Sequence, residues 1–244
     1  MRLSCATMTR RNALSALATA TGLSLVVLVL PLVFPSLSWI AWPLQVLATL
    51  FHELGHGLAA ILCGGEFVRL DVYADGSGVA STMSSGSRLS RAIIAAGGPL
   101  APPFAALALF LSARQPASAR RALLILAGLL LLCLALWLRT PVGILLALAV
   151  VAALALLLAR GSPLAIQSGT CFLAIELSLA AFASVDYLFT AEASTAAGRM
   201  PSDTGQIAHA LFLPHWFWGG LIAALSLAVL WFGLSRFARA LRAA

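Results

Sequence analysis

The chain has 244 residues, of which 61% are hydrophobic and 9% are charged. Soluble domains carry about 25% charged residues, so the composition excludes a water-facing globular fold and favours a polytopic membrane protein. The net charge of +7 comes from fifteen arginines without any lysine, and most arginines stand singly at the ends of apolar runs. This pattern is typical of residues that orient a protein in a lipid bilayer, and it argues against a nucleic-acid partner.

Seven apolar runs are long enough to be membrane helices, at about 20 residues per crossing. They lie near residues 13–34, 38–63, 92–113, 122–138, 141–159, 165–190 and 211–234. No small-residue cleavage site ends the first run, so we predict a retained anchor rather than a signal peptide. The expected fold class is an all-α polytopic membrane protein with about six to seven transmembrane helices. We expect a single membrane domain over residues 1–244.

Two polar segments interrupt the apolar pattern. Residues 66–83 alternate apolar and polar side chains around an Asp-Gly turn, which predicts a small β-hairpin lying against the membrane face. Residues 191–209 are predicted to form a loop that re-enters a helix at "SDTGQ", with Ser202 or Asp203 as the N-cap. In the hairpin, Asp71 is expected to serve the strand surface and Asp75 the turn.

Seven crossings leave the orientation in the membrane open. They would put the amino-terminal group of Arg2, Arg10 and Arg11 on one side and a later group on the other, so the two groups oppose each other. The later group is Arg114, Arg120, Arg121, Arg160, Arg236, Arg239 and Arg242. One relation holds for either orientation. The second and sixth predicted helices run in the same direction, and both end on the face that holds residues 64–91 and 191–210.

The second apolar run contains "FHELGHGLAA" at residues 51–60. An ionisable side chain at the centre of a bilayer costs several kcal/mol, so this polar group needs compensation. On a helix, His52 and His56 share one face, about 6 Å apart between Cβ atoms. That spacing suits two ligands of one Zn²⁺ ion, with Glu53 placed beside them as general base. The sequence therefore predicts a zinc site with His52 and His56 as metal ligands and Glu53 as the catalytic residue.

Glycines and prolines surround the motif. Gly55 and Gly57 are expected to leave room for a neighbouring helix or an extended substrate. Pro99, Pro102 and Pro103 predict a break in the third membrane helix, which a membrane tolerates only beside protein or a water-filled cavity. Two further histidines, in "QIAHALFLPHWFW", are expected to be structural rather than metal ligands.

The residues of "FHELGHGLAAILCGG", "EFVRLDVYADGSGVAST" and "AAGGPLAPPFAAL" together resemble the site-2 protease family of intramembrane zinc metallopeptidases, and in particular its small bacterial membrane branch. The resemblance is good over residues 38–110, the expected metal-site core, and looser over the helices at 165–234. It implies a multi-pass protein of a bacterial cell membrane whose motif histidines bind zinc and whose glutamate is the general base. It also implies that an aspartate from a later helix completes the site.

The third ligand is the point at which the chain departs from that family. The proteases proper carry an N-x-x-P-x-x-x-x-D-G motif, and this chain has none. Asp186 is the first choice, because the predicted sixth helix ends on the same face as the second. Asp203 is the alternative, since the bacterial branch often has a similar S-D-A sequence there, although it would also suit a helix N-cap. Glu176 lies deeper in the sixth helix and remains a third option.

The leading functional interpretation is a zinc-dependent intramembrane endopeptidase that cleaves a transmembrane or juxtamembrane segment of another membrane protein. The alternative is a non-proteolytic membrane protein that keeps the metal site for structure or for partner binding, and the missing aspartate motif favours it. A small transporter is a weaker option, because the predicted fourth to sixth helices are nearly bare of polar residues apart from Glu176. The expected partners are a membrane-protein substrate and the lipid bilayer.

Overall fold

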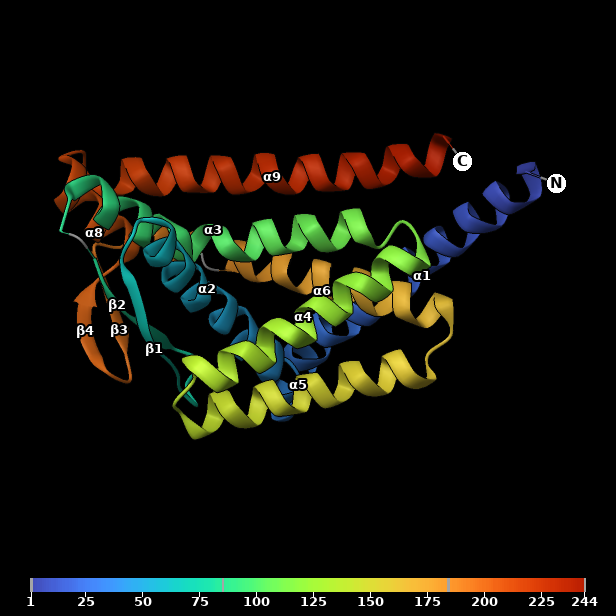
Figure 1. The fold of residues 1–244 in the computed structure, drawn as a ribbon, viewed down its shortest axis with the longest axis horizontal. Helices are drawn as coiled ribbons and strands as arrows, with labels where there is room; N and C mark the ends of the chain where they lie inside the picture. Colours follow the sequence, from blue (N-terminus) through green and yellow to red (C-terminus); the bar gives the residue numbers. More distant parts are fainter. Residues whose placement is uncertain (1, 85, 184, 244) are drawn as a thin grey trace.

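Long helices form a bundle with two small β-hairpins at one end (Figure 1). The computed structural model describes the backbone of residues 2–84, 86–183 and 185–243, and the side chains of residues 12–84, 86–183 and 186–239. The first half of the chain supplies α1 (Arg2–Val33), the 3₁₀ helix η1 (Pro35–Ile40), α2 (Trp42–Leu62), β1 (Glu66–Val72), β2 (Gly78–Met83) and α3 (Arg88–Ser112). The second half supplies α4 (Pro116–Leu136), α5 (Pro141–Arg160), α6 (Pro163–Ala183), α7 (Val185–Leu188), β3 (Glu192–Thr195), β4 (Gly198–Pro201), α8 (Asp203–Leu211) and α9 (His215–Ala243).

Six helices in the described part of the chain are long and apolar enough to cross a membrane. They are Asn12–Val33 within α1, then α3, α4, α5 and α6, and finally His215–Arg239 within α9. This confirms the expected fold class and shows a multi-pass membrane protein. As expected, α2 and α6 run towards the same end of the bundle, where both hairpins lie (Figure 1).

The helix α2, predicted as a crossing, is not among these six. Figure 1 shows it oblique to the long helices and close to β1. The hairpin runs alongside it: the Trp42 indole N–H donates to the Ala74 carbonyl at 2.8 Å, and Thr49 Oγ1 donates to the Gly76 carbonyl at 2.7 Å. Polar residues on α2 lower its mean hydropathy. The hairpin meets Thr49 and Glu53, whereas Asp203 of α8 lies against His52 and His56. The prediction counted the apolar residues of this run without allowing for that polar face.

The first hairpin matches the prediction. Its strands pair antiparallel, and Asp75 Oδ1 accepts hydrogen bonds from both the N–H and the hydroxyl of Ser77, which closes the turn. The outer edge of β1 is held by the link between α4 and α5, where the Leu70 N–H donates to the Trp137 carbonyl at 2.9 Å and the Val72 N–H donates to Thr140 Oγ1 at 3.0 Å. The outer edge of β1 is therefore fastened to the α4–α5 link.

Three other features differ from the predictions. The helix α3 is continuous through Pro99, Pro102 and Pro103, so the predicted break is wrong. These prolines lack the backbone N–H group that would donate within the helix. Contacts with α2, α6 and α9 support α3 in spite of this loss. The sixth apolar run forms two helices, α6 and α7. The second hairpin, β3–β4, was missed because its four-residue strands carry no apolar alternation.

Glycines bring α2 against its neighbours. A Cβ at Gly55 would overlap the Gly97 carbonyl of α3, and one at Gly57 would overlap the Phe67 ring of β1. Small residues allow helix backbones to approach closely in membranes. The expected room beside the motif is thus filled by a neighbouring helix and by the hairpin, which fixes the rotation of α2 about its own axis.

We define two ends of the molecule for use below. The hairpin face carries the four strands, α7, α8 and the link 137–140. The arginine face is the opposite end, where α1 begins and α9 ends (Figure 1). At the arginine face, the buried side chains Ala13, Ala113 and Phe237 pack together, and Gln167 Nε2 donates to the Ala113 carbonyl at 3.0 Å. The predicted separation of the amino-terminal arginines from the later ones is therefore wrong, because α1 begins at the same end of the bundle where α9 ends (Figure 1).

Replacing Thr140 with valine is expected to loosen the hairpin. The change keeps the shape of the side chain but leaves the buried Val72 N–H without its acceptor, which costs about 1–3 kcal/mol. Thermal unfolding in detergent should show a lower midpoint for Thr140→Val, whereas Thr190→Val, at an exposed hydroxyl that donates to the Tyr187 carbonyl, should change little. Equal midpoints for the two variants would contradict the anchoring role.

Candidate metal centre

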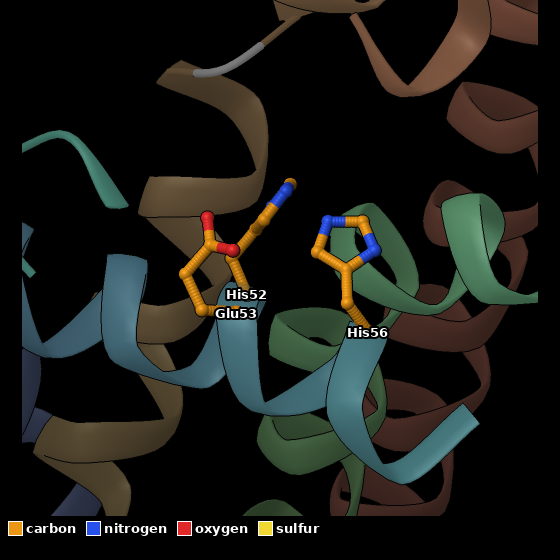
Figure 2. Close-up of side chains that lie close together, drawn as sticks. All are labelled: His52, Glu53 and His56. Atoms are coloured by element: carbon orange, nitrogen blue, oxygen red, sulfur yellow. The ribbon is translucent and has the colours of Figure 1, made fainter. Parts of the chain in front are cut away.

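The motif residues point from α2 into the interior of the hairpin face. Figure 2 shows His52 and Glu53 on adjacent positions and His56 one turn later. Ligand atoms of the three side chains lie within 4.8 Å of one another. Glu53 is buried, with 7% of its surface exposed. The expected clustering of His52, Glu53 and His56 on one helix face is therefore present in the structure.

A backbone carbonyl orients the second histidine. The His56 Nδ1–H donates to the Ile94 carbonyl of α3 at 2.8 Å. In a neutral imidazole this bond puts the proton on Nδ1 and leaves the lone pair on Nε2. Metal-binding histidines commonly make such a bond with the nitrogen that does not bind the metal. The ring is thus held in a form suited to metal binding through Nε2.

Asp203 is the carboxylate that lies against both histidines. Its Oδ2 is 2.9 Å from His52 Nε2, and its Oδ1 is 3.2 Å from His56 Nε2. The residue begins α8, whose N-cap is Ser202, and the Ser202 hydroxyl accepts the Gly205 N–H at 3.0 Å. Capping by Ser202, one of the two predicted N-caps, leaves the Asp203 side chain free to face the histidines.

The electrostatic surroundings keep Asp203 ionised. Burial alone would raise the pKa of this carboxyl, but in their protonated forms His56 and His52 attract its negative charge and donate hydrogen bonds to it, so the pKa falls below its ordinary value. Tyr187 of α7 lies beside it, with a ring 6.2 Å from that of His52 and an OH that accepts the Asp203 N–H at 3.3 Å. Burial raises the pKa of Tyr187, so the phenol stays neutral.

The other two acids considered as third ligands lie elsewhere. Asp186 is exposed on α7, and within the described part of the chain no hydrogen bond or ion pair joins its carboxylate to either histidine, although it lines the same cavity. Glu176 lies on α6 beside Ser24 of α1, and it is not among the described residues that line this cavity. Asp186 was favoured from the sequence because of the direction and depth of the predicted sixth helix. The fold of residues 191–203 instead brings Asp203 over the histidines.

Two glycines make space for the site. A Cβ at Gly98 would overlap the Nε2 atom of His56 and would lie 2.7 Å from that of His52. A Cβ at Gly78 of β2 would lie 2.7 Å from Glu53 Cγ. Neither Gly98 nor Tyr187 was singled out from the sequence. The "AAGGPL" motif was a signal for the first, whereas nothing in the sequence pointed to the second.

A cavity of about 840 Å³ contains the site. Its walls come from α2, β2, α3, the α6–α7 segment, β3–β4, α8 and α9. Two imidazole nitrogens and a carboxylate converge in it beside a second carboxylate, and this donor set fits Zn²⁺ with one position left open. Such a site matches that of a hydrolytic metalloenzyme.

Comparison with protein families agrees with this geometry. Residues 16–233 match the model of the family described as Peptidase M50B-like. The chain belongs to the Peptidase M50B-like family. No curated protein and no solved structure matches the chain. Membership confirms the resemblance to site-2 proteases, and with the His52–Glu53–His56 group it identifies a membrane metallopeptidase.

The close approach of Gly98 to the two histidines yields a test. In this M50B-like peptidase, Gly98→Ala is expected to displace the imidazoles and to lower metal content severalfold, since the new methyl group would occupy the space of the Nε2 atoms. Gly128→Ala is the control, because a Cβ there meets nothing within 4 Å. Metal analysis of both purified variants measures the effect, and unchanged content in Gly98→Ala would contradict the placement.

Proposed function

We propose that this M50B-like peptidase is a zinc-dependent endopeptidase of a bacterial cell membrane, which cleaves a transmembrane or juxtamembrane segment of another membrane protein. The observation that carries the proposal is the convergence of His52 Nε2, His56 Nε2 and the Asp203 carboxylate next to the buried Glu53. On this proposal the zinc ligands are His52, His56 and Asp203. Asp203 thereby takes the place of the aspartate in the missing motif.

The ligand set balances the charge of the ion. Two neutral imidazoles and one carboxylate leave a single positive charge with Zn²⁺, which lowers the cost of holding it in an apolar bundle. The Ile94 carbonyl holds His56 in the required tautomer. Bound there, zinc would polarise the scissile carbonyl and lower the pKa of a water molecule to about 7.

Glu53 is the general base on this proposal. Its carboxylate lies within the cluster of ligand atoms but is not needed to complete the ligand set. It can take the proton from the attacking water and pass it to the amine that leaves the broken peptide bond. Gly78 lies against its side chain, since a Cβ there would come within 2.7 Å of Glu53 Cγ. This packing limits its rotamers and keeps the carboxylate at the site.

The substrate segment would bind as an extended strand along β2. The outer edge of β1 is occupied by Trp137 and Arg139, whereas in the described part of the chain the outer edge of β2 has no strand partner. Residues 78–80 of β2 line the cavity. Addition of a strand to a free edge is a common mode of peptide recognition, and it would hold the scissile bond unwound beside Glu53.

The first test concerns the metal. The purified protein is expected to bind about one zinc ion, and His52→Ala or His56→Ala should remove it, because either change takes away a ligand. Exposed His209, on α8, provides the control variant His209→Ala, which should keep the metal. Unaltered zinc stoichiometry in both motif variants would sink the proposal.

The second test separates the candidate third ligands. Asp203→Ala is expected to lower zinc content much as the histidine variants do, while Asp186→Ala should spare it, since only Asp203 contacts the histidines. Zinc analysis after dialysis against a weak chelator measures the difference. Loss of zinc in Asp186→Ala with retention in Asp203→Ala would transfer the role to Asp186.

The third test separates a peptidase from a non-proteolytic metal-binding protein. Glu53→Gln is nearly isosteric but cannot accept a proton, so it should keep zinc and lower cleavage by about 10²–10⁴-fold. A partner trapped by this variant and cut by the wild-type protein supplies the assay. Cleavage at the wild-type rate would exclude Glu53 as the base, and a trapped partner that the wild-type protein leaves intact would favour the non-proteolytic function.

A further inference from the structure

The arginines divide unequally between the two ends of the molecule. The start of α1, the links α3–α4 and α5–α6, and the end of α9 all lie at the arginine face (Figure 1). Ten of the fifteen arginines belong to these segments or to the adjoining turns of α4 and α5: Arg2, Arg10, Arg11, Arg114, Arg120, Arg121, Arg160, Arg236, Arg239 and Arg242. The remaining five are at the hairpin face: Arg69, Arg88, Arg91, Arg139 and Arg199.

Contacts between distant segments support this division. At the arginine face, Arg120 donates from α4 to the Leu158 carbonyl of α5 at 2.7 Å, and the rings of Phe110 and Phe237 lie 6.3 Å apart. At the hairpin face, the Ala196 N–H donates to Ser77 Oγ at 3.1 Å, which joins the two hairpins. The two groups of arginines are thus separated by the length of the membrane helices.

The acids are distributed in the opposite way. None lies in the described segments of the arginine face. Glu176 is within α6, and the others are at or next to the hairpin face: Glu53, Glu66, Asp71, Asp75, Asp186, Glu192 and Asp203. One of the five arginines there is paired, since Arg69 Nε donates to Asp71 Oδ2 at 2.6 Å. Uncompensated positive charge is therefore concentrated at the arginine face.

Such an excess of arginine in short links orients membrane proteins with that side in the cytoplasm. The links α3–α4 and α5–α6 are only a few residues long, and the other arginines lie close to the ends of candidate membrane helices. Anionic lipids of the cytoplasmic leaflet also attract arginines at this depth. The start of α1 and the end of α9 lie at this same face (Figure 1), so the two terminal clusters act together.

We propose that the arginine face is cytoplasmic and that the metal site opens on the opposite, extracytoplasmic side of the membrane. The part of this inference that concerns the substrate rests on the proposed function. The peptidase then takes a membrane protein whose chain can be unwound near the extracytoplasmic end of its transmembrane helix. Both hairpins and the free edge of β2 meet that segment from outside the cytoplasm, and the Trp42–Ala74 hydrogen bond holds the first hairpin at this level.

Chemical labelling tests the orientation without reference to activity. In a variant with Cys5, Cys63, Cys133 and Cys171 replaced by alanine, single cysteines are placed at exposed Ser81 of β2 and at exposed Gln115 of the α3–α4 link. A membrane-impermeant maleimide added to intact cells with a permeable outer layer is expected to label Ser81→Cys and not Gln115→Cys. In inverted membrane vesicles the pattern should reverse.

A fusion of green fluorescent protein to the carboxyl end supplies a second measurement, which does not depend on cysteine reactivity. Fluorescence equal to that of a known cytoplasmic fusion is expected, because green fluorescent protein does not become fluorescent when it is exported unfolded. Labelling of Gln115→Cys from outside, labelling of both positions from both sides, or a dark fusion at normal protein level would overturn the orientation. Failure of the proposed function would instead show as unchanged zinc content in His52→Ala and His56→Ala or unchanged cleavage in Glu53→Gln, whatever the labelling pattern.

Discussion

The contact between Asp203 and the two histidines joins parts of the chain that are 151 residues apart and closes the hairpin face. A buried carboxylate without partners is costly, and so is a pair of buried imidazoles. Each therefore depends on the other, or on a shared metal, for compensation. The position of α8 follows from this contact together with the packing of Ile207 and Ala210 against Ala92 and Ala95 of α3.

The contact between Asp203 and the two histidines can form only because α2 is held in a defined rotation about its own axis. Gly55 meets the Gly97 backbone on one side, and Gly57 meets Phe67 on another, so a larger residue at either glycine would push the helix away. With α2 so placed, the Ile94 carbonyl is within hydrogen-bonding distance of His56, and Gly98 leaves the Nε2 atoms uncovered. The continuous helix α3 thus serves as the support for the whole site, and its glycines matter there more than its prolines.

The hairpin gives α2 an environment between that of a membrane helix and that of a surface helix. Hydrogen bonds from Trp42 and Thr49 satisfy the Ala74 and Gly76 carbonyls of the turn. The same hairpin presents its free edge to the cavity and packs Gly78 against Glu53. Structural compensation and access for an extended peptide therefore come from one element, which links the stability of the site to its proposed use.

The sequence by itself determined the class of protein, most of the membrane helices, the first hairpin and the motif His52–Glu53–His56, because apolar length, period-two alternation and i, i+4 spacing are local properties. The tertiary structure alone decided which acid lies over the histidines, since Asp203 and Asp186 differ in how residues 186–203 fold rather than in any local pattern. It also decided that α2 lies against the hairpin. The arrangement of the helices gathers the arginines of both termini at one end (Figure 1), and it follows from contacts between distant segments that no window of sequence contains.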